Sequence, residues 1–392
     1  MRILILTQEF PPDLGGIQTY CGELAGRLHA LGHAVCVVCP QFPGATAQDA
    51  SLPYPVLRAR IKPSLLWLWL LPRLGAIAGD FASDVVLYAQ WQSAVWQFLP
   101  GNRAARAIPQ ATLVHGRELH QSVFRAFTRR LAGRVLRRVD LAIAKSRSVR
   151  DRLRELRPEG DCPIVHPGVD ATRFAAGRRE SVRARLGWTG CEIAGVVARL
   201  VPRKNIAALL RAAAALRERH PKLRVLIAGD GPDRGRLRAL STTLGLDDIC
   251  RFTGAVAPDS LADHYAALDV FVMPSLEIAD DLEGFGIVFL EAGAAGVASL
   301  AYRCGGVPDA VKDRRTGLLV TPGDEAGLQA ALSDLLSNER LRRRLGIEAR
   351  ARASALTWTA NGRAIAELLA KLLPAPAAVG DAVGATTSAS PR

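Results

Sequence analysis

A repeated order of short apolar segment, loop and amphipathic helix is the feature that most constrains the fold. Residues 2–7 form an apolar run, and residues 34–39 form a second one. Between them, apolar side chains recur at steps of three and four residues from position 17 to position 31, which is the spacing of one helix face. Strands that are joined by helices pair in parallel sheets with helices on both faces. The pattern therefore predicts an α/β fold.

The same order continues along the chain and divides it into two parts. Apolar segments that end in turns recur at 84–88, 111–114, 141–144, 193–198, 224–228, 270–273, 298–301 and 317–320. Because 392 residues exceed the usual size of one hydrophobic core, we predict two domains, 1–170 and 171–358, joined by a charged segment that begins near Gly168. The residues 374–392, rich in Ala, Gly, Ser and Pro, are predicted to be disordered.

Two glutamates eight positions apart mark the first candidate binding site. Glu283 lies in a glycine-bearing loop after an apolar segment, and Glu291 lies within the apolar run 287–295. Isolated acids are more often a helix-start charge or a solvated residue. The neighbours of Glu291 leave it no exposed face, however, and a buried acid needs a partner. A carboxylate repels phosphate and accepts hydrogen bonds from vicinal hydroxyls, so a sugar or a ribose is the expected ligand.

Three further positions combine the end of a strand with groups that suit an anion or a sugar. Gly16 begins the first helix, where backbone amides can approach a phosphate, although a plain tight turn is the alternative. His115 follows the strand 111–114, and a structural histidine is its alternative. Arg199 and Lys204 stand between a strand and a helix, which suits a diphosphate, with an ordinary surface loop as the alternative.

These motifs, taken in order, resemble those of retaining glycosyltransferases of family 4, which have the GT-B fold. The resemblance rests on the Glu-x7-Glu spacing with Gly-Phe-Gly after the first acid, on Gly305-Gly306-Val307-Pro308, on His115-Gly116 and on the segment from Arg199 to Lys204. It extends over nearly the whole chain. It implies two doubly wound Rossmann-like domains that face each other across a cleft, with a last helix at about 359–373 that returns to the first domain.

The resemblance also implies a role for each candidate residue. The donor-binding residues would be Gly16, Arg199, Lys204, Phe285, Gly286 and Glu291, and the catalytic residues would be His115 and Glu283. Arg199 and Lys204 would hold the diphosphate, and Glu291 would bind the ribose. Glu283 and nearby backbone amides would hold the transferred sugar, with His115 beside its anomeric carbon. Arg203 would not be needed for any of these roles.

The activity implied by the resemblance is transfer of a hexose, with retention of configuration, from a nucleotide-diphosphate sugar to a lipid-linked or glycan acceptor of the cell envelope. The motifs look most like those of bacterial phosphatidylinositol-mannoside-type mannosyltransferases, which favours GDP-mannose as the donor. The chain lacks an Asp-x-Asp, so we expect no metal and no cofactor. The alternatives are a family 4 enzyme that uses a UDP-sugar, a GT-B sugar-nucleotide epimerase, and a non-catalytic protein that binds polyanions.

The charge of the chain bears on its partners. The net charge is +14, and residues 117–157 contribute thirteen Lys and Arg against four Asp and Glu. No aromatic interleaving or nucleic-acid module accompanies these cations, which disfavours DNA and RNA. An arginine-rich helix is most often a solvated face, but its excess charge would also allow peripheral docking on an anionic membrane.

Cysteine usage and hydropathy indicate the compartment. Cys36 and Cys39 lie in one apolar run whose alternation points them to opposite faces, and no second pair follows, so zinc is not expected. We expect all seven cysteines to be reduced. We expect no leader peptide, and the most apolar segment, 65–71, is far shorter than a membrane span. The expected location is the cytoplasm, with peripheral contact to the inner face of the cell membrane as an open possibility.

Overall fold

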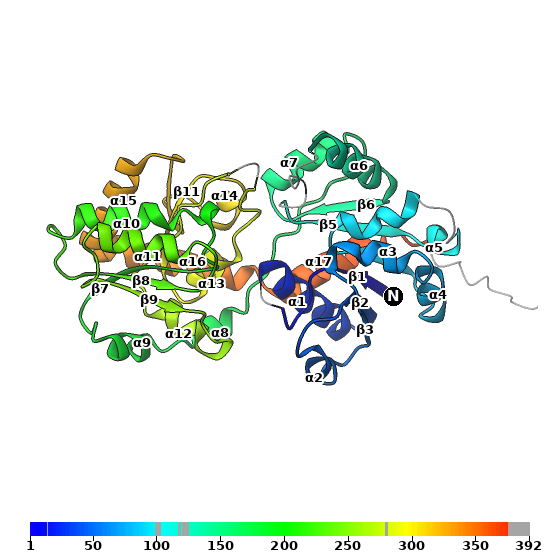
Figure 1. Ribbon diagram of the computed structural model, residues 1–392, viewed down its shortest axis with the longest axis horizontal. Helices are drawn as coiled ribbons and strands as arrows, with labels where there is room; N and C mark the ends of the chain where they lie inside the picture. Colours follow the sequence, from blue (N-terminus) through cyan, green and yellow to red (C-terminus); the bar gives the residue numbers. More distant parts are fainter. Residues whose placement is uncertain (14, 99–102, 117–118, 120–124, 279–280, 375–392) are drawn as a thin grey trace, which may run out of the picture.

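The computed structural model describes all residues except 14, 99–102, 117–118, 120–124, 279–280 and 375–392, so nearly all of the tail predicted to be disordered lies outside the described residues. The chain forms two lobes that lie side by side, each with its own parallel sheet of six strands (Figure 1). Both sheets have the doubly wound order, in which the strand order reverses beside the first strand of the lobe. The predicted architecture of two doubly wound α/β domains is confirmed.

The N-terminal lobe is built on a sheet in the order β3-β2-β1-β4-β5-β6. Its strands are β1 (Arg2–Leu6), β2 (Ala34–Pro40), β3 (Val56–Ala59), β4 (Val85–Tyr88), β5 (Gln110–Val114) and β6 (Leu141–Ala144). Its helices are α1 (Gly16–Ala30), α2 (Ala45–Asp49), α3 (Leu66–Leu70), α4 (Leu74–Asp80), α5 (Arg103–Ala107), α6 (Arg125–Arg138) and α7 (Arg147–Leu156), with 3-10 turns η1 (Pro63–Leu65) and η2 (Trp91–Phe98).

Alternate side chains of this sheet enter two separate cores. Ile3 packs with α1, whereas Leu4 packs with α3, α6 and α7 on the opposite face. Cys36 and Cys39 likewise lie in different cores, as their spacing predicted. All seven cysteines are free. Both faces of the sheet are therefore covered, which is why its strands are apolar at nearly every position.

The C-terminal lobe is built on a sheet in the order β12-β11-β10-β7-β8-β9. Its strands are β7 (Glu192–Val197), β8 (Leu223–Ala228), β9 (Cys250–Gly254), β10 (Val270–Val272), β11 (Ala298–Tyr302) and β12 (Gly317–Val320). Its helices are α8 (Ala171–Ala175), α9 (Arg179–Leu186), α10 (Ile206–Leu216), α11 (Arg234–Thr243), α12 (Leu261–Ala266), α13 (Ile287–Ala294), α14 (Val307–Ala310), α15 (Glu325–Ser337) and α16 (Glu339–Ala355), with 3-10 turns η4 (Pro202–Lys204) and η5 (Pro258–Ser260).

The last helix, α17 (Trp358–Ala370), leaves the C-terminal lobe and packs on α1 of the other lobe. Asn361 donates from Nδ2 to the backbone carbonyl of His166 at 2.8 Å and to the Tyr20 hydroxyl at 3.3 Å. The ring of Trp358 meets Tyr20 edge-on at 5.6 Å. The chain therefore crosses between the lobes twice, once before α8 and once before α17.

The two crossing segments are bonded to each other. Val169 pairs in parallel with Thr357, and the Val169 N–H donates to the Leu356 carbonyl at 2.9 Å. Gly168 lies so close to this second segment that a Cβ at that position would be 2.2 Å from the Trp358 nitrogen. A glycine is needed at position 168 because only a residue without a side chain permits this approach.

Asn361→Ala tests how much the returning helix contributes to stability. The change leaves a buried carbonyl without its described donor, so we expect a loss of about 1–3 kcal/mol in the free energy of unfolding. Urea unfolding followed by circular dichroism measures this loss. Thr359→Ala, on the exposed face of the same helix, is the control, and equal midpoints for the two variants would contradict the assignment.

Candidate active site

A cavity of about 560 Å³ lies between the lobes, at the carboxyl ends of strands from both sheets. Its walls include residues that directly follow β1, β5, β6 and β7, together with the first turns of α1 and α13. Six of the eight predicted site residues line it: Gly16, His115, Arg199, Lys204, Glu283 and Gly286. The carboxyl edge of a doubly wound sheet is where such folds bind ligands.

A compact ion cluster is the centre of this cavity. Lys204 Nζ and Arg203 Nη1 both donate to Glu283 Oε2, at 2.9 and 2.8 Å, and Arg203 also pairs with Asp281 at 3.3 Å. Glu283 is only 7% exposed. Burial alone would raise the pKa of its carboxyl, but Lys204 and Arg203 outweigh burial and hold that pKa far below its usual range. Glu283 is therefore an ionised acceptor and is unsuited to donate a proton.

Local backbone geometry brings the cations of this cluster together. Arg203 and Lys204 lie in the 3-10 turn η4, which Pro202 begins and Asn205 ends in a left-handed conformation with φ +49°. α10 begins immediately afterwards. Both cations thus stand at the end of β7, at the amino end of a helix, and reach the same oxygen of Glu283.

Glycines permit the approach of Glu283 to the other lobe. A Cβ at position 284 would lie 2.0 Å from the His115 carbonyl oxygen and 2.4 Å from Lys145 Cε, both in the N-terminal lobe. Gly286 has φ +83° and begins α13, a conformation that L side chains rarely adopt. The Gly-Phe-Gly sequence is therefore required by the contact between the lobes and by the turn into α13.

His115 lies on the N-terminal wall of the cavity and is 3% exposed. Its Nε2 is 2.9 Å from the Ala89 carbonyl, which assigns the ring proton to that nitrogen, and its ring meets Tyr20 edge-on at 5.2 Å. Burial, with a smaller contribution from the charge of Lys145, holds the pKa of His115 well below its usual value. The imidazole is therefore neutral and held in one orientation.

The amino end of α1 also opens on the cavity. A Cβ at Gly16 would meet no atom within 4 Å, whereas one at Gly15 would lie 2.4 Å from Gln18 Oε1. Among the described residues no side chain caps α1, and its first turn carries no acid. The free N–H groups of a helix start favour an anion. The exposed Arg199 lies on the facing wall, directly after β7.

Two predicted residues do not line this cavity. Phe285 is fully buried, with its ring 5.3 Å from that of His166, so only its backbone could serve a ligand. Glu291 accepts a 2.5 Å hydrogen bond from the Tyr265 hydroxyl, and burial raises the pKa of Glu291. Glu291 lies one helical turn beyond Ile287, which does line the cavity.

Three residues that contact or line this site were not predicted from the sequence. Arg203 binds Glu283 directly, although it was interpreted as unnecessary. Its place beside Lys204 in the same turn was an available signal. Lys145 lines the cavity directly after β6, which the position of that strand could have indicated. Tyr265 binds Glu291 from α12, and no spacing in the sequence reveals that long-range contact.

Within the described part of the chain, no group of three or more His, Cys, Asp or Glu is placed to hold a metal ion. Among the same residues, no helix is long and apolar enough to cross a bilayer. The expectation that no metal is needed stays a prediction.

Two facing Rossmann-like lobes with a charged cavity at their strand ends form the GT-B architecture of glycosyltransferases. HepE from Anabaena, solved in complex with UDP, has this fold with a TM-score of 0.81 at 22% identity, over 95% of this chain and 100% of that one. The sequence model of glycosyltransferase family 4 matches residues 14–173, and that of glycosyl transferases group 1 matches residues 178–352.

Two curated relatives are similar over nearly their whole length. A GDP-mannose-dependent alpha-(1-6)-phosphatidylinositol monomannoside mannosyltransferase from Mycolicibacterium smegmatis is 32% identical, covering 94% of this chain and 98% of that protein. A D-inositol 3-phosphate glycosyltransferase from Streptomyces scabiei is 31% identical, covering 91% of this chain and 86% of that protein. This chain belongs to glycosyltransferase family 4 and is a hexosyltransferase.

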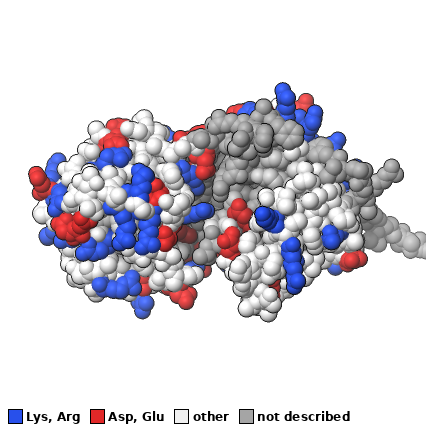
Figure 2. All heavy atoms as spheres, viewed as in Figure 1, with Lys and Arg blue, Asp and Glu red and all other residues white. Residues whose placement is uncertain are grey.

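Basic side chains are spread over both lobes (Figure 2). The α6 arginines at 129, 130, 134, 137 and 138 are exposed, whereas Ala132, Val135 and Leu136 of the same helix are buried. Further Lys and Arg side chains gather over α10 and α11 of the other lobe. α3 buries Leu66 and Leu70, whereas Leu65 and Leu68 beside them are exposed.

Glu283→Gln tests the ion cluster. The pKa of Glu283 is lower in the folded chain than its ordinary value of about 4.5, so its ionised form stabilises the fold fully above that pH and less below it. The amide leaves two buried cations without this partner, and we expect a loss of about 3–5 kcal/mol near neutral pH. Urea unfolding between about pH 3 and pH 7 measures the loss. If the difference in unfolding free energy between variant and wild type does not shrink toward about pH 3, the ionised state of Glu283 in the folded chain is contradicted.

The protonation state of His115 predicts the shape of the pH–rate profile. Because its pKa lies well below the ordinary value of 6.5, the ring is neutral throughout the range from about pH 6 to pH 8 and contributes no titration there. We expect His115→Gln to lower kcat/KM without changing the shape of the profile in this range. If kcat/KM of the wild type changes with pH near 6.5 and this change is absent in the variant, His115 does titrate in this range.

Proposed function

We propose that the protein transfers mannose from GDP-mannose to a lipid-linked acceptor, with retention of configuration, in the cavity between the lobes. The observation that carries this proposal is the ionised Glu283, which is held by Arg203 and Lys204 opposite the neutral His115. A buried carboxylate that stays charged is a strong acceptor for sugar hydroxyls. The cations beside it provide the positive field that a nucleotide diphosphate needs.

We place the diphosphate between the cations of the C-terminal wall and the amino end of α1. Arg199 and Lys204 stand on the C-terminal wall, and the open amino end of α1 at Gly16 faces them from the other lobe. Charge that develops on the leaving phosphate is stabilised by such fixed cations and N–H groups. The proposed reaction therefore uses no bound metal.

The sugar and the ribose occupy opposite sides of these phosphates. Glu283 and the backbone at Gly286 contact the sugar hydroxyls on the α13 side of the cavity. Glu291, bonded to Tyr265, lies one turn further along α13 and outside the cavity lining, so in this proposal the ribose extends past Ile287 to reach it. In this proposal Glu283 thus recognises the hydroxyls of the transferred sugar, and Glu291 recognises those of the ribose.

Retention follows from attack on the same face from which the diphosphate leaves. The bond between the anomeric carbon and the phosphate oxygen breaks, the acceptor oxygen bonds to that carbon, and the acceptor proton passes to the leaving phosphate. Glu283 cannot supply a proton because it is ionised. His115, neutral and fixed by Ala89, orients the sugar beside the reacting carbon.

The choice of donor is supported by the relatives named for GDP-mannose, at 32–34% identity. The alternative is a UDP-sugar, for which the support is the fold shared with UDP-bound HepE at 22% identity. Thermal shift with GDP, UDP and their sugars discriminates the two, because a ligand of the folded state raises Tm by mass action. A larger shift with UDP-glucose than with GDP-mannose would overturn the donor assignment.

The acceptor is proposed from the same relatives and from the surface charge. The exposed arginines of α6 suit an anionic lipid surface, worth about 1 kcal/mol for each contacting cation. Phosphatidylinositol monomannoside in vesicles and D-inositol 3-phosphate in solution are therefore the acceptors to compare by mass spectrometry. Conversion of the donor sugar without any acceptor would instead indicate an epimerase.

Lys204→Ala is expected to lower kcat/KM for GDP-mannose by about 10–100-fold, because it removes a charged hydrogen-bond donor from the phosphate side and loosens Glu283. Radiolabelled mannose transfer measures this. Lys222→Ala, an exposed lysine of the same lobe, is the control and should retain wild-type turnover. Wild-type turnover by Lys204→Ala would remove the lysine from the diphosphate site.

A further inference from the structure

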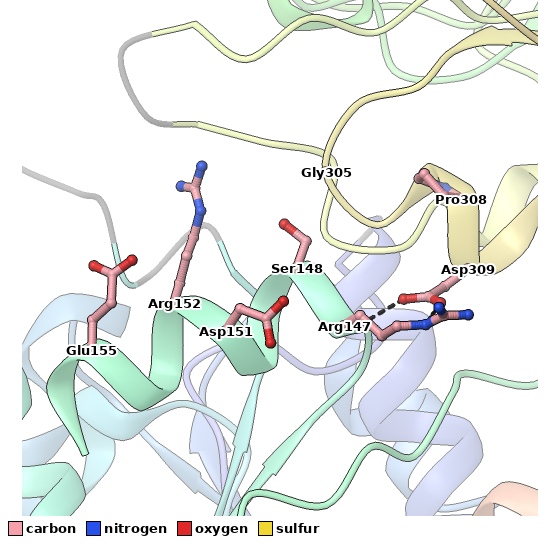
Figure 3. A pocket seen from close by; sticks show the side chains of 8 residues that line it. All are labelled: Arg147, Ser148, Asp151, Arg152, Glu155, Gly305, Pro308 and Asp309. Atoms are coloured by element: carbon pink, nitrogen blue, oxygen red, sulfur yellow. Dashed lines mark hydrogen bonds and ion pairs between the residues drawn. The ribbon is translucent and has the colours of Figure 1, made fainter. Parts of the chain in front are cut away.

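The lobes also touch outside the cavity, where α7 meets α14. The backbone N–H of Arg147 donates to Asp309 Oδ2 at 2.6 Å, and its guanidinium Nε donates to Asp309 Oδ1 at 2.9 Å (Figure 3). Arg147 is the first residue of α7, whose start is capped by the Ser146 hydroxyl. One carboxylate of the C-terminal lobe therefore receives two hydrogen bonds from one residue of the N-terminal lobe.

Asp309 depends on this contact because it is only 3% exposed. Lys312 and Arg352 of its own lobe lie near enough to attract it electrostatically, but both described hydrogen bonds to its carboxylate come from Arg147. The Arg147 side chain is 64% exposed, so the pair is partly open to solvent. Separation of the lobes at this point breaks both hydrogen bonds that the Asp309 carboxylate accepts from Arg147.

A second ion pair between the lobes lies nearby. Arg152 Nη2 contacts Glu277 Oε1 at 2.5 Å, and both side chains are partly exposed. Between α7 and residues 305–309 lies an open pocket of about 390 Å³ instead of an apolar core. At this edge the described side chains that join the lobes include both the Arg147–Asp309 and the Arg152–Glu277 pair, and Asp309 is the more buried of the two acids.

Short links connect this contact to both walls of the cavity. Arg147 is two residues after Lys145, which lines the cavity at the end of β6. On the other side, α14 follows Gly306, whose N–H donates to the Glu283 carbonyl at 2.7 Å. A displacement of Asp309 relative to Arg147 would therefore be transmitted to the distance between Lys145 and Glu283.

We propose that Asp309 is a positioning residue that holds the two lobes closed at the spacing the transfer reaction requires. Neither Asp309 nor Arg147 lines the cavity, and Asp309 acts through Arg147 and α7. The kinetic part of this proposal rests on the proposed mannose transfer, whereas the structural part concerns the closure of the lobes and can be measured without any substrate.

Asp309→Asn is the direct test, and the chain offers a matched control. Asp263 has the same pattern within one lobe, since it accepts from the backbone N–H and the guanidinium of Arg178, at 2.7 and 3.0 Å, and is 7% exposed. We expect Asp309→Asn to raise KM for GDP-mannose by about tenfold, the loss of roughly one charged hydrogen bond. Asp263→Asn should leave KM unchanged even if it lowers Tm equally.

Small-angle scattering measures closure of the lobes independently of sugar transfer. Without ligand, and again with GDP, we expect a larger radius of gyration for Asp309→Asn and for Arg147→Gln than for wild type or Asp263→Asn. Arg147→Gln keeps the backbone N–H and alters an exposed side chain, so it tests closure even if Asp309→Asn does not fold. Unchanged radii for both variants would overturn the proposal.

A double-mutant cycle completes the test. If Arg147 and Asp309 act through each other, the double variant should raise KM no more than the more severe single variant. Additive effects on KM would show that the two residues act separately and would overturn the proposed positioning role of Asp309. If wild type transfers no mannose, the kinetic arm fails together with the proposed function, and the scattering radii still decide whether the lobes are held closed.

Discussion

The buried charge of Glu283 is the constraint around which the cavity is arranged. A carboxylate out of water must be compensated, and here the compensation comes from two adjacent cations of one turn. That requirement fixes η4 against the loop before α13, and so holds the ends of β7 and β10 at one place. The same loop carries Gly284, whose lack of a side chain lets it meet His115 of the other lobe. Electrostatic compensation within one lobe thus also determines where the second lobe makes contact.

Much of the fold could be predicted from the sequence because its strands are buried on both faces. Such strands are apolar at nearly every position and stand out between amphipathic helices, as residues 3–6 and 225–228 show. The strand order within each sheet is not visible in that pattern, since it depends on contacts between distant segments. For the return of α17 to α1, the resemblance was the only source, because the bonds of Asn361 join residues far apart in the chain.

The candidate site was predictable where a chemical group directly follows a strand. His115 and Arg199 line the cavity for this reason, since the strand ends of a parallel sheet meet at one edge, and Glu283 reaches the same edge from the loop between β10 and α13. Roles that depend on side-chain direction could not be predicted. Arg203 was dismissed although it reaches Glu283, and the ring of Phe285 points into the core. Spacing along the chain gives the location of a side chain but not its partner.

The pairing of the two crossing segments has a consequence for how the lobes move. A single linker would let one lobe twist and tilt freely relative to the other. Here Val169 is bonded beside Leu356 and Thr357, so both linkers must bend together. Two tethers fixed side by side resist torsion and permit rotation chiefly about one axis. A change in the angle between the lobes would therefore bend both linkers together.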